Sequence, residues 1–190
     1  VALAYEHLNR LSTDGSSGGF PLKGPRTNHV FKENPAKQMI GPSSMAFSPD
    51  GKSVYLTGYM WQSIHGANSG SIQAVFKLNY ETNEEMSIFA GFDTEKDYGD
   101  DNSHFSVPTS VETDQTGNVY VSDFVNNRVQ IFDSSGKLLK SLSVKNPAKV
   151  SVHQKTGEIY IFSWAIIGIP LELDKKINYQ PDKIPQIMGK

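Results

Sequence analysis

The stretch Val107–Asp133 reads VPTSVETDQTGNVYVSDFVNNRVQIFD, and it decides the fold that we expect for the whole chain. It holds three short runs rich in β-branched and aromatic residues, at 109–113, 119–121 and 129–132. A Thr-Gly turn separates the first two runs, and a polar corner at 123–128 separates the last two. Short β-rich runs separated by turn residues predict an antiparallel meander. A single meander cannot bury both of its faces, so it needs neighbouring sheets.

The same sequence pattern recurs on both sides of this stretch. Each copy begins with a proline, has an apolar residue three positions later, passes a glycine turn and ends in an apolar-Tyr-apolar run. The copies begin at Pro42, Pro108 and Pro147, which are 66 and 39 residues apart. A period of roughly 40 residues with four strands per unit is typical of a β-propeller blade. The wider first interval indicates a blade that carries long loops.

The central copy also contains a recognisable motif. Residues 114–123 read DQTGNVYVSD, and Asn126-Asn127-Arg128 follows them. An Ala-Gly pair at 90–91 and a Gly/Asp-rich segment at 99–101 come before. This arrangement resembles the NHL repeat, whose pattern includes Asp-x-x-Gly-Asn-x-Tyr-Val-x-Asp and then Asn-His/Asn-Arg.

Two features depart from the family pattern. Ser110 stands where the family has glycine after Pro-x, and the third copy has Ser163 and Gly168 in place of the Asp and Arg of the second. The resemblance covers roughly residues 42–174. It implies an all-β fold, a β-propeller of four-stranded antiparallel blades. About three to four blades would lie in this chain, as part of a larger ring of the six-bladed type.

The expected organisation has two parts. Residues 1–41 have little periodic pattern and include a Gly/Ser-rich linker, so they form an N-terminal arm or a degenerate blade. Residues 42–190 carry the blades, at 42–91, 107–144 and 147–174, and end in a C-terminal extension.

Composition excludes several classes of function. The chain has 190 residues, with 18 basic and 20 acidic side chains and a net charge of −2, which gives no case for nucleic acid as a partner. No apolar run approaches the roughly 20 residues needed to span a bilayer. Cysteine is absent, so disulfides and thiol chemistry are excluded. The opening Val1-Ala2-Leu3-Ala4 fits the end of a signal peptide and suggests export to the periplasm or the cell exterior.

The positions of the loops indicate where function lies. In a four-stranded meander, the corner between the second and third strands lies at the same end as the link to the next blade. Both long loops, Gly58–Ser71 and Gly91–Ser106, fall at that end. Loops on a rigid scaffold commonly carry binding function. The candidate binding residues at this end are Tyr59, Trp61, His65, His104, Phe124, Asn126 and Trp164.

Each candidate also has a structural interpretation. Trp61 and Trp164 can cap blade junctions. The two loop histidines are weak metal candidates, so metal binding stays open. No cofactor is expected. The acidic segment 93–101 lacks the residue order of an EF-hand, although calcium binding by its carboxylates stays open. Asp123 and Arg128 flank one corner and are expected to form a structural clasp. No known catalytic motif occurs, and no catalytic residue is assigned.

Three hypotheses for the function follow. The first is a non-catalytic module that binds a protein or an extended ligand through its loop-rich face. The second is a propeller enzyme, for which the resemblance allows a metal-dependent lyase or a lactonase-like hydrolase. The third is a structural subunit of an extracytoplasmic assembly. In each case we expect a protein partner or further blades to complete the ring, because open sheet edges promote aggregation.

Overall fold

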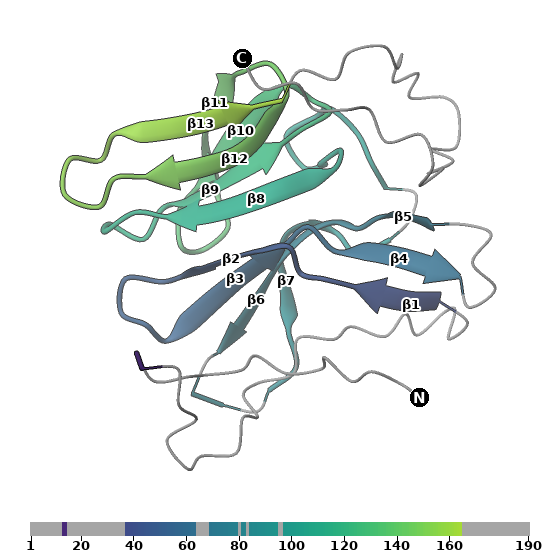
Figure 1. Cartoon of the computed structure of the whole chain (residues 1–190), viewed down its shortest axis with the longest axis horizontal. Coiled ribbons are helices and arrows are strands. Elements are labelled where there is room, and N and C mark those ends of the chain that lie inside the picture. The colour runs from purple at the N-terminus through teal and green to yellow at the C-terminus, as the bar shows by residue number, and fades with distance from the viewer. Residues whose placement is uncertain are drawn as a thin grey trace.

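The computed structural model describes residues 13–14, 37–63, 69–79, 81–82, 84–94 and 97–164 (Figure 1). Within these ranges every regular element is a β-strand, and the strands form antiparallel sheets of two to four strands. The expected all-β fold is confirmed. In the described part of the chain, no helix has the length and apolar character of a membrane span.

The first blade is a four-stranded meander with its strands in the order β2-β3-β6-β7. Its first turn is fixed by Asp50, whose Oδ1 accepts hydrogen bonds from the Ser48 hydroxyl at 2.6 Å and from the Lys52 amide at 3.1 Å. The strands are β2 Ser44–Phe47, β3 Ser53–Thr57, β6 Gln73–Asn79 and β7 Ser87–Phe92.

The second blade repeats this meander in the order β8-β9-β10-β11. Side chains alternate between the two faces of a strand, so Val119 and Val121 of β9 pack in one cluster with Tyr55 of blade one. Tyr120, between them, packs with Val150 of the third sheet. The strands are β8 Pro108–Thr113, β9 Val119–Asp123, β10 Arg128–Phe132 and β11 Leu138–Ser143.

The third sheet consists of β12 (Pro147–Val152) and β13 (Ile159–Ser163), an antiparallel pair that begins a third blade. Val150 and Val152 face blade two. The strand expected near 169–174 lies outside the described residues.

The expected loop at 58–71 differs in the structure. It forms a hairpin of β4 (Met60–Ser63) and β5 (Ser69–Ser71), and β1 (Lys37–Ile40) pairs with β4. The hairpin continues the β3–β6 ladder, because the Ile72 amide donates to the Tyr59 carbonyl at 2.9 Å. Gly70 lies against the indole of Trp61, where a Cβ would come within 2.7 Å of Nε1.

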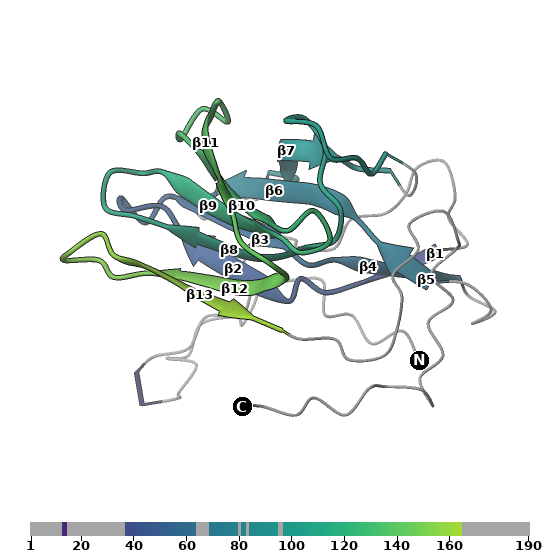
Figure 2. The ribbon, with the colours of Figure 1, turned by 90° about the horizontal axis from the view of Figure 1, so that it is seen from above.

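The innermost strands of successive blades, β2, β8 and β12, lie side by side (Figures 1 and 2). Ser44 Oγ accepts a hydrogen bond from the Val111 amide at 3.1 Å, and Ser110 Oγ accepts one from the Val150 amide at 3.3 Å. Ser44 and Ser110 hold the same position, two residues after the proline that begins each copy. Ser110, which replaces the family glycine, therefore joins two blades.

Candidate functional site

The loops gather at one end of the blades, as the topology predicted. We call this end the loop face and define it by residues 58–63, 69–72, 91–94, 97–107, 124–127 and 144–146, together with Trp164. It lies at the right-hand side of Figures 1 and 2, where the β4–β5 hairpin and the link from β7 to β8 meet. The short turns at 48–52 and 153–157 lie at the left-hand side.

A buried carboxylate organises the loop face from within. Asp123, at the end of β9, is fully buried. Its Oδ1 accepts a hydrogen bond from the Ser106 amide at 2.7 Å. Its Oδ2 accepts from Asn126 Nδ2 at 2.8 Å and from Arg128 Nε at 2.7 Å. Burial raises the pKa of Asp123, and the hydrogen bonds from Ser106, Asn126 and Arg128 oppose that rise. The predicted clasp of Asp123 and Arg128 is confirmed.

The other guanidinium nitrogens of Arg128 bind the main chain of the link between the blades. Nη1 donates to the carbonyl of Asp100, and Nη2 donates to the carbonyls of Asp101 and His104, each at 2.7 Å. The Asn126 amide adds a bond to the Gly99 carbonyl at 2.6 Å. Residues 99–104 are thereby held to the corner that follows β9.

His104 lies on this immobilised segment. Its Nδ1 is 2.8 Å from both carboxylate oxygens of Asp101, and its ring stacks on Phe92 with the centroids 4.5 Å apart. The hydrogen bond with His104 lowers the pKa of Asp101. The side chain of His104 is 28% exposed, so the imidazole is oriented by protein groups and still reaches solvent.

Two of the predicted binding residues are core residues. Tyr59 is 1% exposed, packs edge-on against Phe76 and donates its hydroxyl to Met86 Sδ at 3.3 Å. Burial raises the pKa of Tyr59. Phe124 is 6% exposed and lies edge-on to Trp164. Both chain positions lie at the loop face, but both rings point inward, and a role for Tyr59 and Phe124 in binding stays a prediction.

The other predicted residues have different environments. Trp164 is half exposed, Trp61 is partly buried over Gly70, and Asn126 is engaged in the clasp. His65 lies outside the described residues. In the ranges described, no group of three His, Cys, Asp or Glu side chains converges on a possible metal position.

Sequence reasoning missed two aromatic residues of the loop face. Tyr98 is 49% exposed and Phe92 is 37% exposed. Phe92 directly precedes the acidic segment 93–101 and Tyr98 lies within it, where the carboxylates drew attention to metal binding instead. The sequence offered one signal for an exposed aromatic residue here, because Tyr98 stands next to Gly99 in an inserted loop.

Comparisons with known proteins agree with the propeller fold. Residues 105–132 match the family model of the NHL repeat. No curated protein matches the sequence. A gluconolactonase from Xanthomonas campestris superposes with a TM-score of 0.53 at 20% identity, over 84% of this chain and 42% of that one. A luciferin-regenerating enzyme gives 0.47 at 16% identity, over 64% of this chain and 36% of that one.

A calcium-binding protein, regucalcin from Agrobacterium tumefaciens, gives a TM-score of 0.36 at 17% identity, over 57% of this chain and 32% of that chain. The likeness to the gluconolactonase shows a shared propeller fold. The chain spans less than half the length of each of these three structures.

Proposed function

We propose that this NHL-repeat propeller chain is a non-catalytic module that binds a protein or another extended ligand through its loop face. The observation that carries the proposal is the clasp of Arg128, which holds residues 99–104 by three carbonyl contacts while Tyr98 remains exposed beside them. A loop ordered before binding loses less conformational entropy when it meets its partner.

The exposed groups of the loop face suit such a contact. Tyr98, Phe92 and Trp164 are between 37% and 50% exposed. Aromatic residues are enriched in the energetic centres of protein interfaces, where they bury large areas with few rotatable bonds. Export to the periplasm or the cell exterior is part of this proposal, and a structural subunit of an extracytoplasmic assembly is a separate alternative.

The test compares binding by matched variants. Tyr98→Ala combined with Trp164→Ala removes two exposed rings of the loop face, and Leu139→Ala removes an equally exposed apolar side chain on β11, away from it. A protein captured by the chain from an extract of its own organism should be lost with the double variant and retained with Leu139→Ala. Equal capture by all three forms would refute the proposal.

The enzymatic alternative rests on the His104–Asp101 pair, an oriented imidazole on the loop face of a fold shared with a gluconolactonase. A shared fold does not establish a shared activity, because proteins with the propeller fold have many unrelated functions. Hydrolysis of a sugar lactone, together with a stoichiometric divalent metal, would favour this alternative if both were lost in His104→Ala. The binding proposal predicts neither.

A further inference from the structure

Three ring side chains, Phe92, Tyr98 and His104, form one exposed surface on the link between blades one and two. We call them the aromatic platform. Phe92 and Tyr98 are 37% and 49% exposed, and the His104 side chain is 28% exposed. The rings of Phe92 and His104 stack with their centroids 4.5 Å apart. The Tyr98-Gly99 segment passes against the same histidine, because a Cβ on Gly99 would lie 3.1 Å from His104 Cβ.

The segment that carries the platform is strongly acidic. Residues 91–107 hold five acidic side chains and one lysine, so their net charge is −4 with histidine neutral, against −2 for the whole chain. The Asp97 carboxylate accepts a hydrogen bond at 2.5 Å from the hydroxyl of Thr94, two residues after Phe92. Asp100 is exposed, and its carboxylate bonds to no residue that the structure describes. Negative charge therefore lies directly beside the exposed rings.

Arg128, which holds this segment in place, does not neutralise these carboxylates. Its Nε pairs with the buried Asp123, and its other two nitrogens donate to main-chain carbonyls. Its side chain is only 12% exposed. The charge of Arg128 is therefore compensated by Asp123, and neither Asp97 nor Asp100 has an ion-pair partner in the described ranges.

The arrangement of the carboxylates does not suit a metal ion. Both oxygens of Asp101 lie 2.8 Å from His104 Nδ1, and Oδ1 also accepts a hydrogen bond from the Ser103 amide at 2.7 Å. Over the part of the chain that the structure describes, no three carboxylate or imidazole side chains meet at one position. The aspartates border an aromatic surface instead, and this combination suits a flat organic cation.

An arginine side chain matches both features of this surface. Its guanidinium group is planar, stacks on aromatic rings and donates paired hydrogen bonds to carboxylates. A lysine ammonium pairs with a carboxylate as a point charge and has no planar face to stack. The exposed rings therefore provide the contact area, and the aspartates select the charge of the group that binds there.

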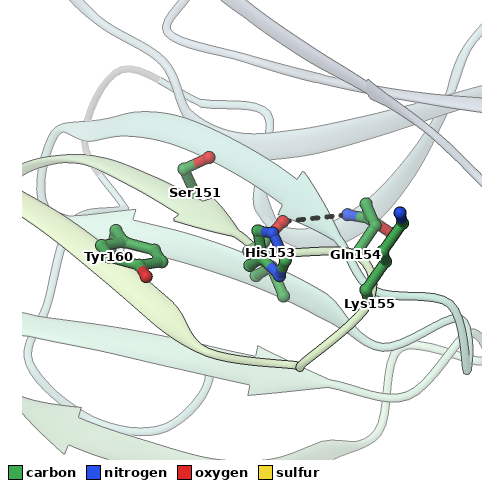
Figure 3. Close-up of a pocket in the computed structure, with 6 residues that line it drawn as sticks. Ser151, His153, Gln154, Lys155 and Tyr160 are labelled. Atoms are coloured by element: carbon green, nitrogen blue, oxygen red, sulfur yellow. Dashed lines mark hydrogen bonds between the residues drawn. The ribbon is translucent and has the colours of Figure 1, made fainter.

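A depression at the other end of the blades offers the opposite chemistry (Figure 3). It lies beside the turn at 153–157, where His153 and Lys155 contribute to its lining, and no carboxylate is among the residues that line it. Complementary charge guides association and disfavours contact between like charges. A cationic segment is therefore directed to the aromatic platform and away from this depression.

We propose that the aromatic platform binds an arginine-bearing segment of a protein partner. A guanidinium group of that segment stacks on the exposed rings, while Asp97 and Asp100 accept its hydrogen bonds. The platform lies within the loop face, so this inference rests on the binding function proposed above and specifies the chemistry of the partner.

The test measures binding of two short synthetic peptides to the recombinant chain by fluorescence anisotropy. Arginine alternates with glycine in one peptide, and citrulline replaces arginine in the other, which keeps the shape of the side chain and removes its charge. The arginine peptide should bind at low salt, and the citrulline peptide should bind about tenfold more weakly or less. Equal binding of the two peptides would overturn the proposal, as would no binding of the arginine peptide.

A pair of double variants locates the contact. Asp97→Asn with Asp100→Asn should weaken binding of the arginine peptide by about tenfold, because two exposed ion pairs are lost. Glu84→Gln with Glu85→Gln changes the net charge equally in the turn between β6 and β7, away from the loop face, and should leave binding unchanged within about twofold. Circular dichroism establishes first that both variants are folded.

Three further outcomes separate the alternatives. Equal weakening in both double variants would overturn the proposal, because net charge alone would then attract the peptide. Displacement of the peptide by one equivalent of Ca²⁺ would also overturn it and would identify a metal site. In the capture experiment, a protein that is lost with Tyr98→Ala and Trp164→Ala but retained with Asp97→Asn and Asp100→Asn would refute the arginine contact alone. Equal capture by every form would refute the binding function itself.

Discussion

Asp123 connects the sequence motif to the geometry of the loop face. The NHL pattern places an aspartate at the end of the second strand and an arginine five residues later, at Arg128. In the fold the carboxylate is fully buried, and three hydrogen bonds compensate its charge. The motif therefore holds the loop at residues 99–104 in place, and its residues need not contact a ligand.

Replacing Asp123 by alanine should lower the free energy of unfolding by roughly 3–5 kcal/mol, because Arg128 would be left without its buried partner. Urea denaturation measures this loss. Asp100→Ala, at an exposed aspartate of the same loop face, is the control and should change stability by less than about 0.5 kcal/mol. A loss of the same size in both variants would contradict the role of Asp123 as a clasp.

Gly91 is a second residue on which the loop face depends. It has a φ of +80°, and an added Cβ would lie 2.2 Å from the Gln73 carbonyl oxygen and 2.7 Å from the Phe105 ring. Gly157 has a similar φ of +73° with nothing within 4 Å. A comparison of Gly91 with Gly157 therefore separates the energetic cost of the left-handed backbone conformation from the cost of close packing.

Gly157→Ala should cost only the left-handed backbone conformation, about 1–2 kcal/mol. Gly91→Ala should cost that amount plus about 1–3 kcal/mol for overpacking against the main chain. Thermal unfolding of the two variants measures the difference. Equal losses would show that the link leaves β7 differently from the structure described.

At the scale of elements, three turns use the same carboxylate arrangement. Asp50, Asp114 and Asp133 each accept hydrogen bonds from an amide and a hydroxyl within their turn. Burial alone would raise the pKa of Asp114, but hydrogen bonds from Thr116, Asn118 and Tyr120 outweigh it and lower that pKa. Hydrogen bonds also lower the pKa of Asp50, chiefly that from Ser48, and of Asp133, chiefly that from Ser135.

These lowered pKa values predict the dependence of stability on pH. The folded state binds fewer protons at these carboxyls than the unfolded state, so their contribution is complete above the unfolded pKa of about 3.9. It is lost as the pH falls through the lower pKa values of the folded state. Asp114→Asn should therefore show a smaller loss of stability between pH 7 and pH 3 than the wild type, measured by urea denaturation. An unchanged pH dependence would show that Asp114 contributes nothing to it.

Strands and turns were predictable where local chemistry determines them. The repeated pattern from proline to tyrosine predicted a strand pair in each copy, and the runs expected at 109–113, 119–121 and 129–132 match β8, β9 and β10 within two residues. The β4–β5 hairpin was not predictable, because the segment 65–71, HGANSGS, reads as a loop and its strands depend on pairing with the distant β1. Likewise, sequence placed Tyr59 and Phe124 at the correct end of the blades but not the direction of their rings, which tertiary packing decides.

At the scale of the whole molecule, the blades are joined by recurring contacts rather than by one continuous sheet. The cluster between blades one and two contains Tyr55 and Val75 on one side and Val111, Val121 and Phe132 on the other. This packing joins blades one and two, whose loops form most of the loop face. The Asp and Arg of the central repeat were predictable as a clasp, while its three carbonyl contacts depend on how the link between the blades folds.

The most direct measurement of this architecture is hydrogen exchange at two amides on the inner strands. Val111 donates to Ser44 and Val150 donates to Ser110, each across a blade boundary. Ser44→Ala should accelerate exchange at Val111 and leave Val150 unchanged, whereas Ser110→Ala should do the reverse. Each substitution should cost about 1–3 kcal/mol, because a buried donor loses its acceptor. Exchange at Val111 and Val150 that is insensitive to both substitutions would contradict the arrangement of these repeats as neighbouring blades.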